Sequence, residues 1–340
     1  MASAIVPFNR LQLGMSVITT KGTLVPATRQ IIGDHTMLEE EDFYRSPYPA
    51  GVRSNVGGAG VIIRQGTKVT ASTELTAEEI LWALLTGVKG GITPSTVDTL
   101  AKNWLFTPEL TTGVVTIDTA SLEMARGDGT TNHYTGLAAY GMTESFKIDW
   151  AFNQIAKLTI NMFARARAAG AITGSIVQYP SREALTSNQM AVYWDTAYAN
   201  LGNTALAGLV RSASFTCTTG YAPDYTLDGR TTVDFTIHKV GNISGDLSLV
   251  MEFDAVAATK FALYRSDSLV YIRLHTTGSL IGSVNALKFV RIDGAYRFKA
   301  APTFAPDGNQ ILCTMNLESV YDTTGTKTLE FSAQNLLSVI

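Results

Sequence analysis

The sequence predicts a mainly β protein made of two tandem antiparallel β-sandwich or barrel domains, each flanked by a short helix. Three observations indicate this fold class. Apolar and polar residues alternate through many short segments, which is the pattern of half-buried strands. Gly, Ser, Thr and Val are frequent, as strands and tight turns require. In addition, one strand-pair pattern occurs twice along the chain.

The first copy of this pattern is formed by segments 146–150 and 157–162, and the second starts at Phe298 and returns through 313–317. The offset is 298 − 146 = 152 residues at the first strand and 316 − 161 = 155 at the second. A fixed internal period indicates that one unit has been used twice. Chance similarity of two amphipathic hairpins is the alternative, but the shared order of strand, capped helix and strand pair favours duplication.

The first half opens with an extended, loop-rich stretch over residues 8–66. It contains the acidic run Glu39–Asp42 and is dense in Pro and Gly from residue 46 to 60. A long segment with such weak periodicity is typical of a functional arm, a binding loop or disorder. We therefore expect an arm over residues 34–66.

A helix is expected after a short strand at 67–72. Its start is marked by the capping box Thr76–Glu79, in which hydroxyl and carboxylate satisfy each other's free backbone N–H groups. Apolar residues from Ile80 to Val88 then follow at helical spacing, and Gly90 and Gly91 end the helix. The remaining strands expected in this half cover 114–118, 146–150 and 157–162.

The second half is more plainly β, and residues 176–208 are predicted to be the linker that leads into it. Asp254 caps a short second helix, at an offset of 252 − 74 = 178 from the first. The domains are therefore predicted at 1–175 and 209–340, with 178 − 152 = 26 extra residues in the first, after its helix. Strands are expected at 212–218, 233–238, 247–251, 269–274, 296–303 and 329–331.

The composition excludes several classes of protein. Charged residues make up 16% of the chain, below the usual ~25%, so much surface is buried internally or against partners. A net charge of −3 offers no basic excess for gripping nucleic acid. No stretch of about 18 apolar residues predicts a membrane span, and the first residues do not resemble a signal peptide. We expect the chain to be made in the cytoplasm of its host cell.

Catalytic and metal-binding signatures are missing from the sequence. No Gly-x-Ser-x-Gly elbow occurs, and the glycines at 57–60 lack the Lys-Ser/Thr of a phosphate loop. Cys217 and Cys313 are expected to be reduced core thiols. We therefore predict no catalytic residue, no cofactor and no metal, with an enzyme whose site is assembled only in space as a remote alternative. The histidines, none with a metal-like i, i+4 partner, are His35, His133, His238 and His275.

A series of segments gives a more specific indication. After the Pro/Gly-rich stretch come TELTAEEILWALLTG, NHYTGLAAYGMTESFKIDW and KLTINMFARA, followed by VYWDTAYANLGNTAL and LVRSASFTCTT. Their order resembles the tail tube proteins (major tail proteins) of long, non-contractile-tailed bacteriophages. The resemblance spans roughly Arg45 to Thr218, and the second half fits the same fold more loosely.

The resemblance implies tube-type domains, six to a ring, with rings stacked into a hollow tube through which viral DNA passes without specific binding. Two domains per chain imply a ring of three chains with pseudo-sixfold symmetry, and a hexamer is the second choice. Implied partners are further copies of the chain and other tail proteins: tape measure, terminator and distal tail. No membrane partner is implied, and the expected location is the tail of the virion.

The arm supplies the candidate contact between rings. Its candidate residues are Glu39, Glu40, Glu41, Asp42, Tyr44 and Arg45. The alternative function is a receptor- or carbohydrate-binding β-sandwich module of a virion, which would act without forming a tube.

Overall fold

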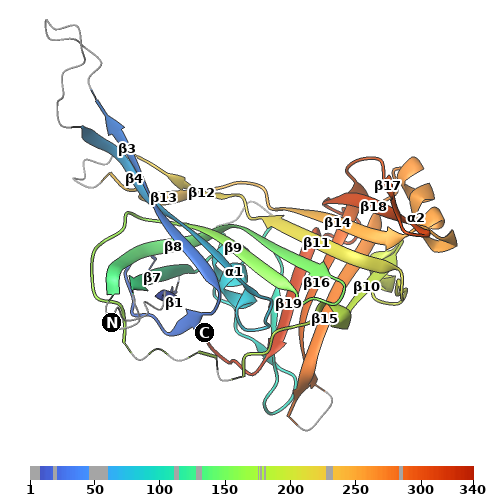
Figure 1. The fold of residues 1–340 in the computed structure, drawn as a ribbon, viewed down its shortest axis with the longest axis horizontal. Helices are drawn as coiled ribbons and strands as arrows, with labels where there is room; N and C mark the ends of the chain where they lie inside the picture. Colours follow the sequence, from blue (N-terminus) through green and yellow to red (C-terminus); the bar gives the residue numbers. More distant parts are fainter. Residues whose placement is uncertain are drawn as a thin grey trace, which may run out of the picture.

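The computed structural model describes residues 8–17, 21–45, 60–110, 115–127, 132–174, 176, 178–179, 181–226, 233–282 and 286–340. These residues form a mainly β, antiparallel protein, as predicted (Figure 1). The first half contains β1 (Phe8–Ser16), β2 (Arg29–Ile31), β3 (Asp34–Tyr44), β4 (Val61–Glu74), α1 (Ile80–Gly87), β5 (Ser95–Thr96), β6 (Lys102–Phe106), β7 (Thr119–Gly127), β8 (Asn132–Ala151) and β9 (Lys157–Ala164). The second half contains β10 (Met190–Asp195), β11 (Val210–Thr218), β12 (Tyr221–Asp224), β13 (Ile237–Val240), β14 (Ser244–Glu252), α2 (Ala255–Arg265), β15 (Val270–Ile281), β16 (Ala286–Phe298), β17 (Thr303–Asp307), β18 (Gln310–Ser319) and β19 (Leu329–Asn335).

The long strand β8 organises the first half. Its first part pairs with β7, and its second part pairs with β9 along one edge and with β11 along the other. Between these parts the register shifts, and Tyr140 adopts a positive φ of 61°. Such irregularities bend a strand and re-aim its side chains. β8 therefore belongs to two sheets and carries the chain from one to the other.

The two halves repeat the same antiparallel pairings in the same order. In the first half the order is β3–β4–β9–β8–β7–β1, and in the second it is β11–β14–β18–β16–β15–β10. A helix follows the second strand of each series, α1 after β4 and α2 after β14. Between the helix and the next strand of the shared order, β7 in the first half and β15 in the second, lie residues 88–118 and 266–269. The difference is 31 − 4 = 27 residues. The extra residues include β5 and β6, where the sequence places its insertion.

The halves are joined through the β8–β11 ladder, so their strands form one continuous sheet. The last strand, β19, returns to pair with β6 of the first half. The segment predicted as a linker, 176–208, is integrated into the fold, since it contains β10 and its residues Leu185 and Trp194 are buried. The division into domains 1–175 and 209–340 remains a prediction.

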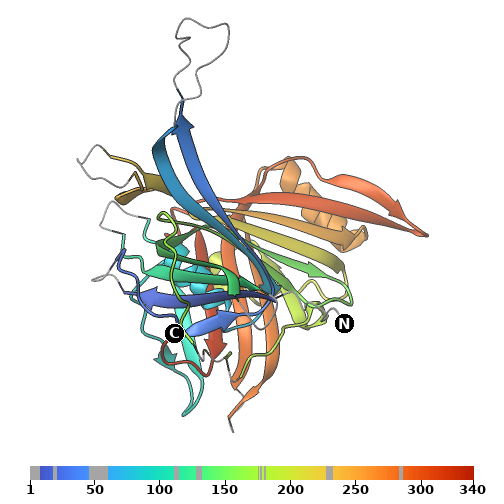
Figure 2. The same ribbon diagram turned by 60° about the vertical axis from the view of Figure 1, so that its left-hand side comes forward.

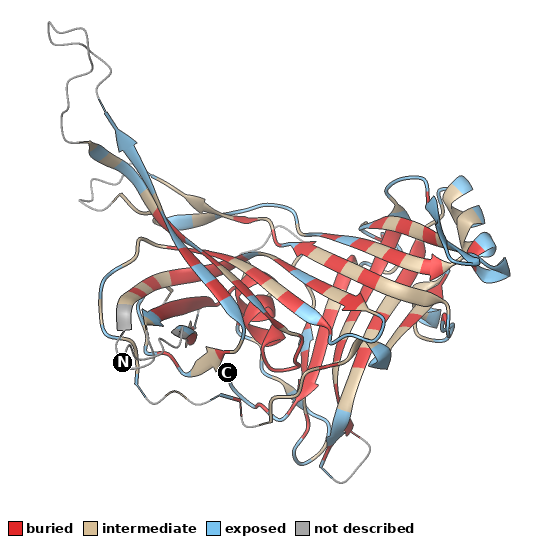
Figure 3. Ribbon diagram, in the orientation of Figure 1, coloured by how far each residue is buried: buried red, intermediate tan, exposed pale blue. Residues whose placement is uncertain are grey.

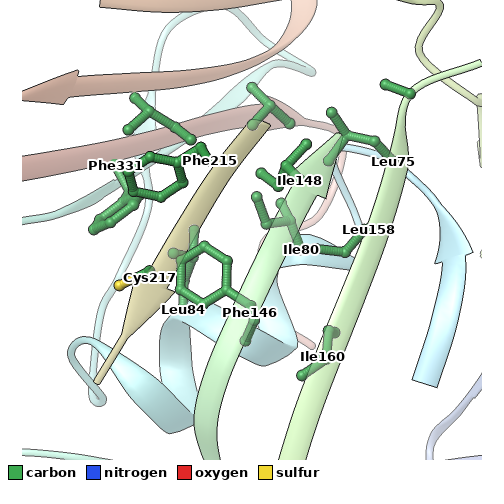
Figure 4. Close-up of a cluster of buried hydrophobic side chains, with 14 of the residues drawn as sticks. Leu75, Ile80, Leu84, Phe146, Ile148, Leu158, Ile160, Phe215, Cys217 and Phe331 are labelled. Carbon is green, nitrogen blue, oxygen red and sulfur yellow. The ribbon is translucent and has the colours of Figure 1, made fainter. Parts of the chain in front are cut away.

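The two helices occupy different environments. All eight residues of α1 are buried, and the helix packs under β8 (Figure 4). In α2 only Ala257 is buried, and the helix lies at the far corner of the molecule (Figures 1 and 3). Asp254 caps α2 as predicted, because its carboxylate accepts a 2.9 Å hydrogen bond from the Ala257 N–H. The first helix is therefore a core element and the second a surface element.

The capping box at α1 forms only in part. The Glu79 N–H donates to Thr76 Oγ1 at 2.9 Å, as predicted. The Glu79 carboxylate, however, accepts hydrogen bonds from the Ile32 N–H at 3.3 Å and from Arg182 Nε at 3.0 Å. The helix starts at Ile80. Instead of capping it, the Glu79 carboxylate joins the residue after β2 to the 176–208 segment.

Buried charges beside α1 connect the two halves. Lys288 Nζ on β16 lies 3.6 Å from Glu78 and 3.5 Å from Glu183, and it also donates to the Ser181 carbonyl. Burial raises the pKa of Glu78, while Lys288 and the Ser181 hydroxyl oppose the increase. Removing one member of such a buried group would leave its partner uncompensated. This cluster therefore fixes β16 against the N-terminal end of α1.

Some sequence expectations are wrong in detail. In the stretch 8–66 that was predicted to be loop-rich, the described residues 8–17 and 21–44 carry β1, β2 and β3, and the Pro/Gly-rich residues 46–59 lie outside the described residues. Of the strand predicted at 114–118, Val114 lies outside the described residues, and 115–118 form no strand; β7 begins at Thr119. The Gly90 N–H donates to the Thr116 carbonyl and the Asp118 N–H to the Leu85 carbonyl, so this segment is joined to the end of α1 instead.

Two strands predicted in the second half are also altered. Residues 233–236 do not form a strand, since the Val233 carbonyl bonds to the Gln65 N–H of β4. The strand expected at 296–303 is interrupted after Phe298 and resumes in β17, with both parts running along β18.

The two cysteines are buried and free, as the sequence predicts. Cys217 is fully enclosed, and burial raises the pKa of its thiol. Cys313 is buried on β18. Both therefore act as small apolar core residues.

Trp150 is only 2% exposed, and its indole N–H donates to Thr276 Oγ1 at 2.9 Å. Replacement by Ala would leave a large cavity and an unpaired hydroxyl, so we expect Trp150→Ala to lower the free energy of unfolding by about 3–5 kcal/mol. Phe152, two residues later and 59% exposed, is the matched control. Its replacement by Ala should change that free energy by less than ~1 kcal/mol. Equal effects in chemical denaturation would contradict the placement of Trp150.

Candidate assembly and lumen surfaces

The hairpin of β3 and β4 extends far beyond the body of the protein (Figures 1 and 2). The arm predicted from the sequence covers residues 34–66. From here on, the arm means only the outer part of this hairpin, the described residues 41–45 and 60–65. The arm exposes large apolar side chains: Val61 is 63% exposed, Ile63 59%, Tyr44 51% and Phe43 48%. Exposed apolar side chains clustered on a projecting hairpin indicate a surface that another molecule covers.

The predicted contact residues lie on β3 and its continuation at Arg45, which is exposed. The acidic run is paired along its length within the chain. Asp42 lies 2.7 Å from Arg64, Glu40 lies 3.0 Å from Lys68, and Glu39 contacts Arg167. The Glu41 carboxylate accepts a 2.9 Å hydrogen bond from Gln65. Exposed pairs of this kind contribute only ~0–1 kcal/mol each, so they can be exchanged for contacts with a partner at little cost.

The base of the arm is braced by a segment that the sequence analysis did not single out. Tyr225, just after β12, donates its hydroxyl to the Gln65 carbonyl at 3.3 Å, and Arg64 lies over its ring at 5.7 Å. Phe235 packs below, in a cluster with Tyr140 and Phe163. The second half of the chain thus supports an arm that belongs to the first half.

One face of the main sheet is lined by small polar side chains. The register places Thr36, Thr70, Asn161, Ser145 and Thr218 in one row across β3, β4, β9, β8 and β11. Thr70 donates to Asn161 at 3.0 Å, and Asn161 donates to Ser145 at 3.1 Å. A corresponding row in the second half runs through Ser214, Ser248 and Asn316. We call this the polar face.

Charges on the polar face are balanced. Lys147 pairs with Asp149 and Lys299 pairs with Asp246, each at 2.9 Å. The opposite face carries the apolar core, including Phe146, Ile148 and Phe215 (Figure 4). Figure 3 shows the resulting alternation of buried and less buried residues along the strands. The polar face is therefore a hydroxyl-rich surface on which these lysines are paired with carboxylates.

The sequence contains the signal for the polar face, since Ser, Thr and Asn occupy the polar phase of successive strands. That phase is visible at Thr159 and Asn161 and again at Ser212 and Ser214. What the sequence cannot supply is the register, which alone shows that these residues form continuous rows.

The titratable groups show no clustering of the kind that binds metals. Within the described part of the chain, no group of three His, Cys, Asp or Glu side chains could hold a metal ion. His35 is buried with its Nε2 3.0 Å from the Ile31 carbonyl oxygen, and His238 lies 3.1 Å from the Tyr140 hydroxyl. Among the residues described, no helix is long and apolar enough to cross a membrane.

A projecting arm with exposed apolar side chains and an extended polar face on a β fold are features of a structural protein. The sequence pattern of the phage tail tube protein family matches residues 9–312, and the chain belongs to that family. It is thus a structural tail component of a virion, as the sequence resemblance indicates. No curated protein matches the chain.

His275 on β15 provides a test by pH. Burial, with Arg291 and Arg273 nearby and Asp293 opposing them, lowers the pKa of His275 to about 4. In the unfolded chain its pKa is about 6.5, so the unfolded state takes up the proton first as the pH falls. The stability that neutral His275 contributes is therefore present above about pH 6.5 and lost towards pH 4. His275→Gln should show a smaller fall in Tm over this range than the original chain, and equal falls would refute the assignment.

Proposed function

We propose that this chain assembles into rings that stack to form the hollow tail tube, and that the tube is the conduit for DNA ejection. The protein acts through assembly and not as an enzyme, and it is made in the host cytoplasm before it enters the virion tail. Family membership supports the tail location. The polar face is the observation that carries the proposal.

The polar face has the properties that a DNA conduit requires. A wall rich in Lys and Arg would hold the phosphate backbone by counterion release, and the genome would stick. A strongly acidic wall would repel it. Small hydroxyl and amide side chains with paired charges, as at Lys147–Asp149 and Lys299–Asp246, do neither. We therefore assign the polar face to the lumen.

The repeated pairing order supports a stoichiometry for the ring. Each half places four strand positions in the main sheet: β3, β4, β9 and β8 in one, and β11, β14, β18 and the β16–β17 edge in the other. We propose three chains per ring with pseudo-sixfold symmetry, six chains being the second choice. Twenty-four strands at a spacing of about 4.8 Å give a wall about 115 Å around, or roughly 37 Å across. A double helix passes through an opening of that size.

The arm is proposed to make the contact between stacked rings. It combines exposed apolar side chains, such as Tyr44 and Val61, with the exchangeable ion pair Asp42–Arg64. Tape measure, terminator and distal tail proteins are the further partners expected inside the tube and at its ends.

Negative-stain microscopy tests assembly and stacking together. We expect the purified chain to form rings and tubes, and persistent monomers under all conditions would contradict the proposal. A variant with Phe43, Tyr44 and Ile63 replaced by Ser should form rings that do not stack, because the apolar contact is lost. Leu105→Ser, at an exposed apolar residue outside the arm, is the control and should still form tubes. Tubes from the arm variant would exclude the arm as the contact between rings.

The lumen assignment predicts a gain of DNA binding. Tubes of Ser214→Lys/Thr216→Lys chains should bind duplex DNA in a salt-dependent manner, while unmodified tubes should bind little. The control, Thr323→Lys, adds a charge in the exposed turn between β18 and β19. Equal retention of DNA by control and double variant, measured by nuclease protection, would remove the polar face from the lumen.

A further inference from the structure

The ladder between the two halves has no counterpart elsewhere in the described chain. β11 pairs with β14 on one edge and with β8 on the other. Its equivalent β3 pairs with β4 on one edge, and its other edge pairs with no strand among the described residues. Likewise, β8 holds β11, whereas the equivalent edge at the end of β16 and along β17 holds no strand in the part described. Two edges that would form the missing ladder are therefore both free.

We propose that β3 of one chain pairs with the β16–β17 edge of the next, reproducing the internal β8–β11 ladder between chains. The occupant of each edge is thus a second copy of this protein. This inference rests on the proposed ring and names the strands that close it. Unpaired edges are otherwise a liability for aggregation, and main-chain pairing gives such a contact its affinity.

The backbone geometry agrees on both edges. At the ends of the β8–β11 ladder, the Phe152 N–H donates to the Arg211 carbonyl at 3.2 Å and the Thr219 N–H donates to the Glu144 carbonyl at 3.0 Å. The backbone N–H and C=O groups of even-numbered β8 residues therefore point towards those of odd-numbered β11 residues. The offset of 178 relates β3 to β11, so the N–H and C=O groups of odd-numbered β3 residues should point away from β4. The His35 carbonyl does so and accepts a 2.8 Å hydrogen bond from the Asn9 side chain, and the unpaired part of the β3 edge begins after His35.

The rows of the polar face fix the register. In the first half, one row runs Thr36–Thr70–Asn161–Ser145 and continues to Thr218 across the ladder. In the second half, the matching row runs Ser214–Ser248–Asn316, and the Lys299 N–H donates to the Asn316 carbonyl at 2.9 Å. Lys299 thus stands where Ser145 stands, at an offset of 299 − 145 = 154, two residues more than the 152 that the sequence pattern gave for this strand. The residue equivalent to Thr218 is 218 − 178 = 40, so Glu40 of the next chain lies opposite Lys299.

The charges suit this register. Lys299 is paired with Asp246 and Glu40 with Lys68 within each chain, and all four side chains are partly exposed. Pairing of the edges would produce an alternating series, Asp246–Lys299 followed by Glu40–Lys68 of the next chain. The acidic residue placed at the contact between rings by sequence reasoning would instead close the ring. The outer residues Tyr44 and Arg45 remain available for stacking.

Disulfide trapping tests the register. Since the Lys299 N–H points to β18, Lys299 and Glu40 would form a non-hydrogen-bonded pair, whose Cα atoms lie about 4.5 Å apart and permit a disulfide. The chain carrying Glu40→Cys and Lys299→Cys should give covalent dimers and trimers on a non-reducing gel after oxidation. Ser145→Cys/Thr218→Cys, the internal equivalent, should give only an intrachain bond. Lys68→Cys/Lys299→Cys should give none, because Lys68 lies one strand further away and two residues along, at roughly 12 Å.

The outcomes separate this inference from the proposed function. Rings seen by microscopy together with interchain bonds at 40 and 299 support both. Rings without those bonds, while the 145/218 control oxidises, overturn the strand assignment and leave the tube intact. Absence of rings overturns the proposed function and the strand assignment with it. A charge exchange gives a second readout: Glu40→Lys should reduce ring formation and added Lys299→Glu should restore it, and failure of the rescue would contradict the pairing.

Discussion

The β8–β11 ladder is the constraint on which the rest of the structure depends. It joins two halves with the same pairing order into one sheet, and so aligns their polar rows. An unpaired strand edge exposes backbone N–H and C=O groups that a further strand can bind. Among the described strands, β11 binds such an edge of β8 within the chain, while the outer edges of β3 and of β16–β17 pair with no strand. In the proposed ring, these two edges pair with neighbouring chains.

The two faces of the sheet divide the work of stability and function. The apolar face packs on α1, and the buried charges of Glu78 and Lys288 fix β16 beside it. The polar face contributes less to the stability of the fold, since its hydroxyl and amide side chains bond mainly to one another. In the proposed tube this face meets the passing polyanion, and that role requires no change in the core. The arm is separated in the same way, because the described ends of β3 and β4 extend beyond the body that folds around β8 (Figure 1).

Much of the fold follows from sequence, and the failures have physical causes. Alternation located β11 and β14 because each has one buried face, and the Asp254 cap located α2. It located only the start of β19, whose residues are buried on both faces. The same alternation misplaced strands at 115–118 and 233–236. Ile117 and Phe235 are buried there, but the backbones bond to a helix end and to the arm. The repeat with its insertion was readable because helix and strand pair carry local signals. The rows of the polar face and the free edges depend on register between distant strands, which a single sequence does not encode locally.

The central claim is that one chain supplies two walls of the ring. A cross-section average of assembled tubes, from cryo-electron microscopy, counts the chains directly. The account predicts three chains per ring, arranged with threefold symmetry around a lumen bounded by six similar sheet segments. Six complete chains around one ring would contradict it, because each chain would then contribute only one of its halves to the lumen wall.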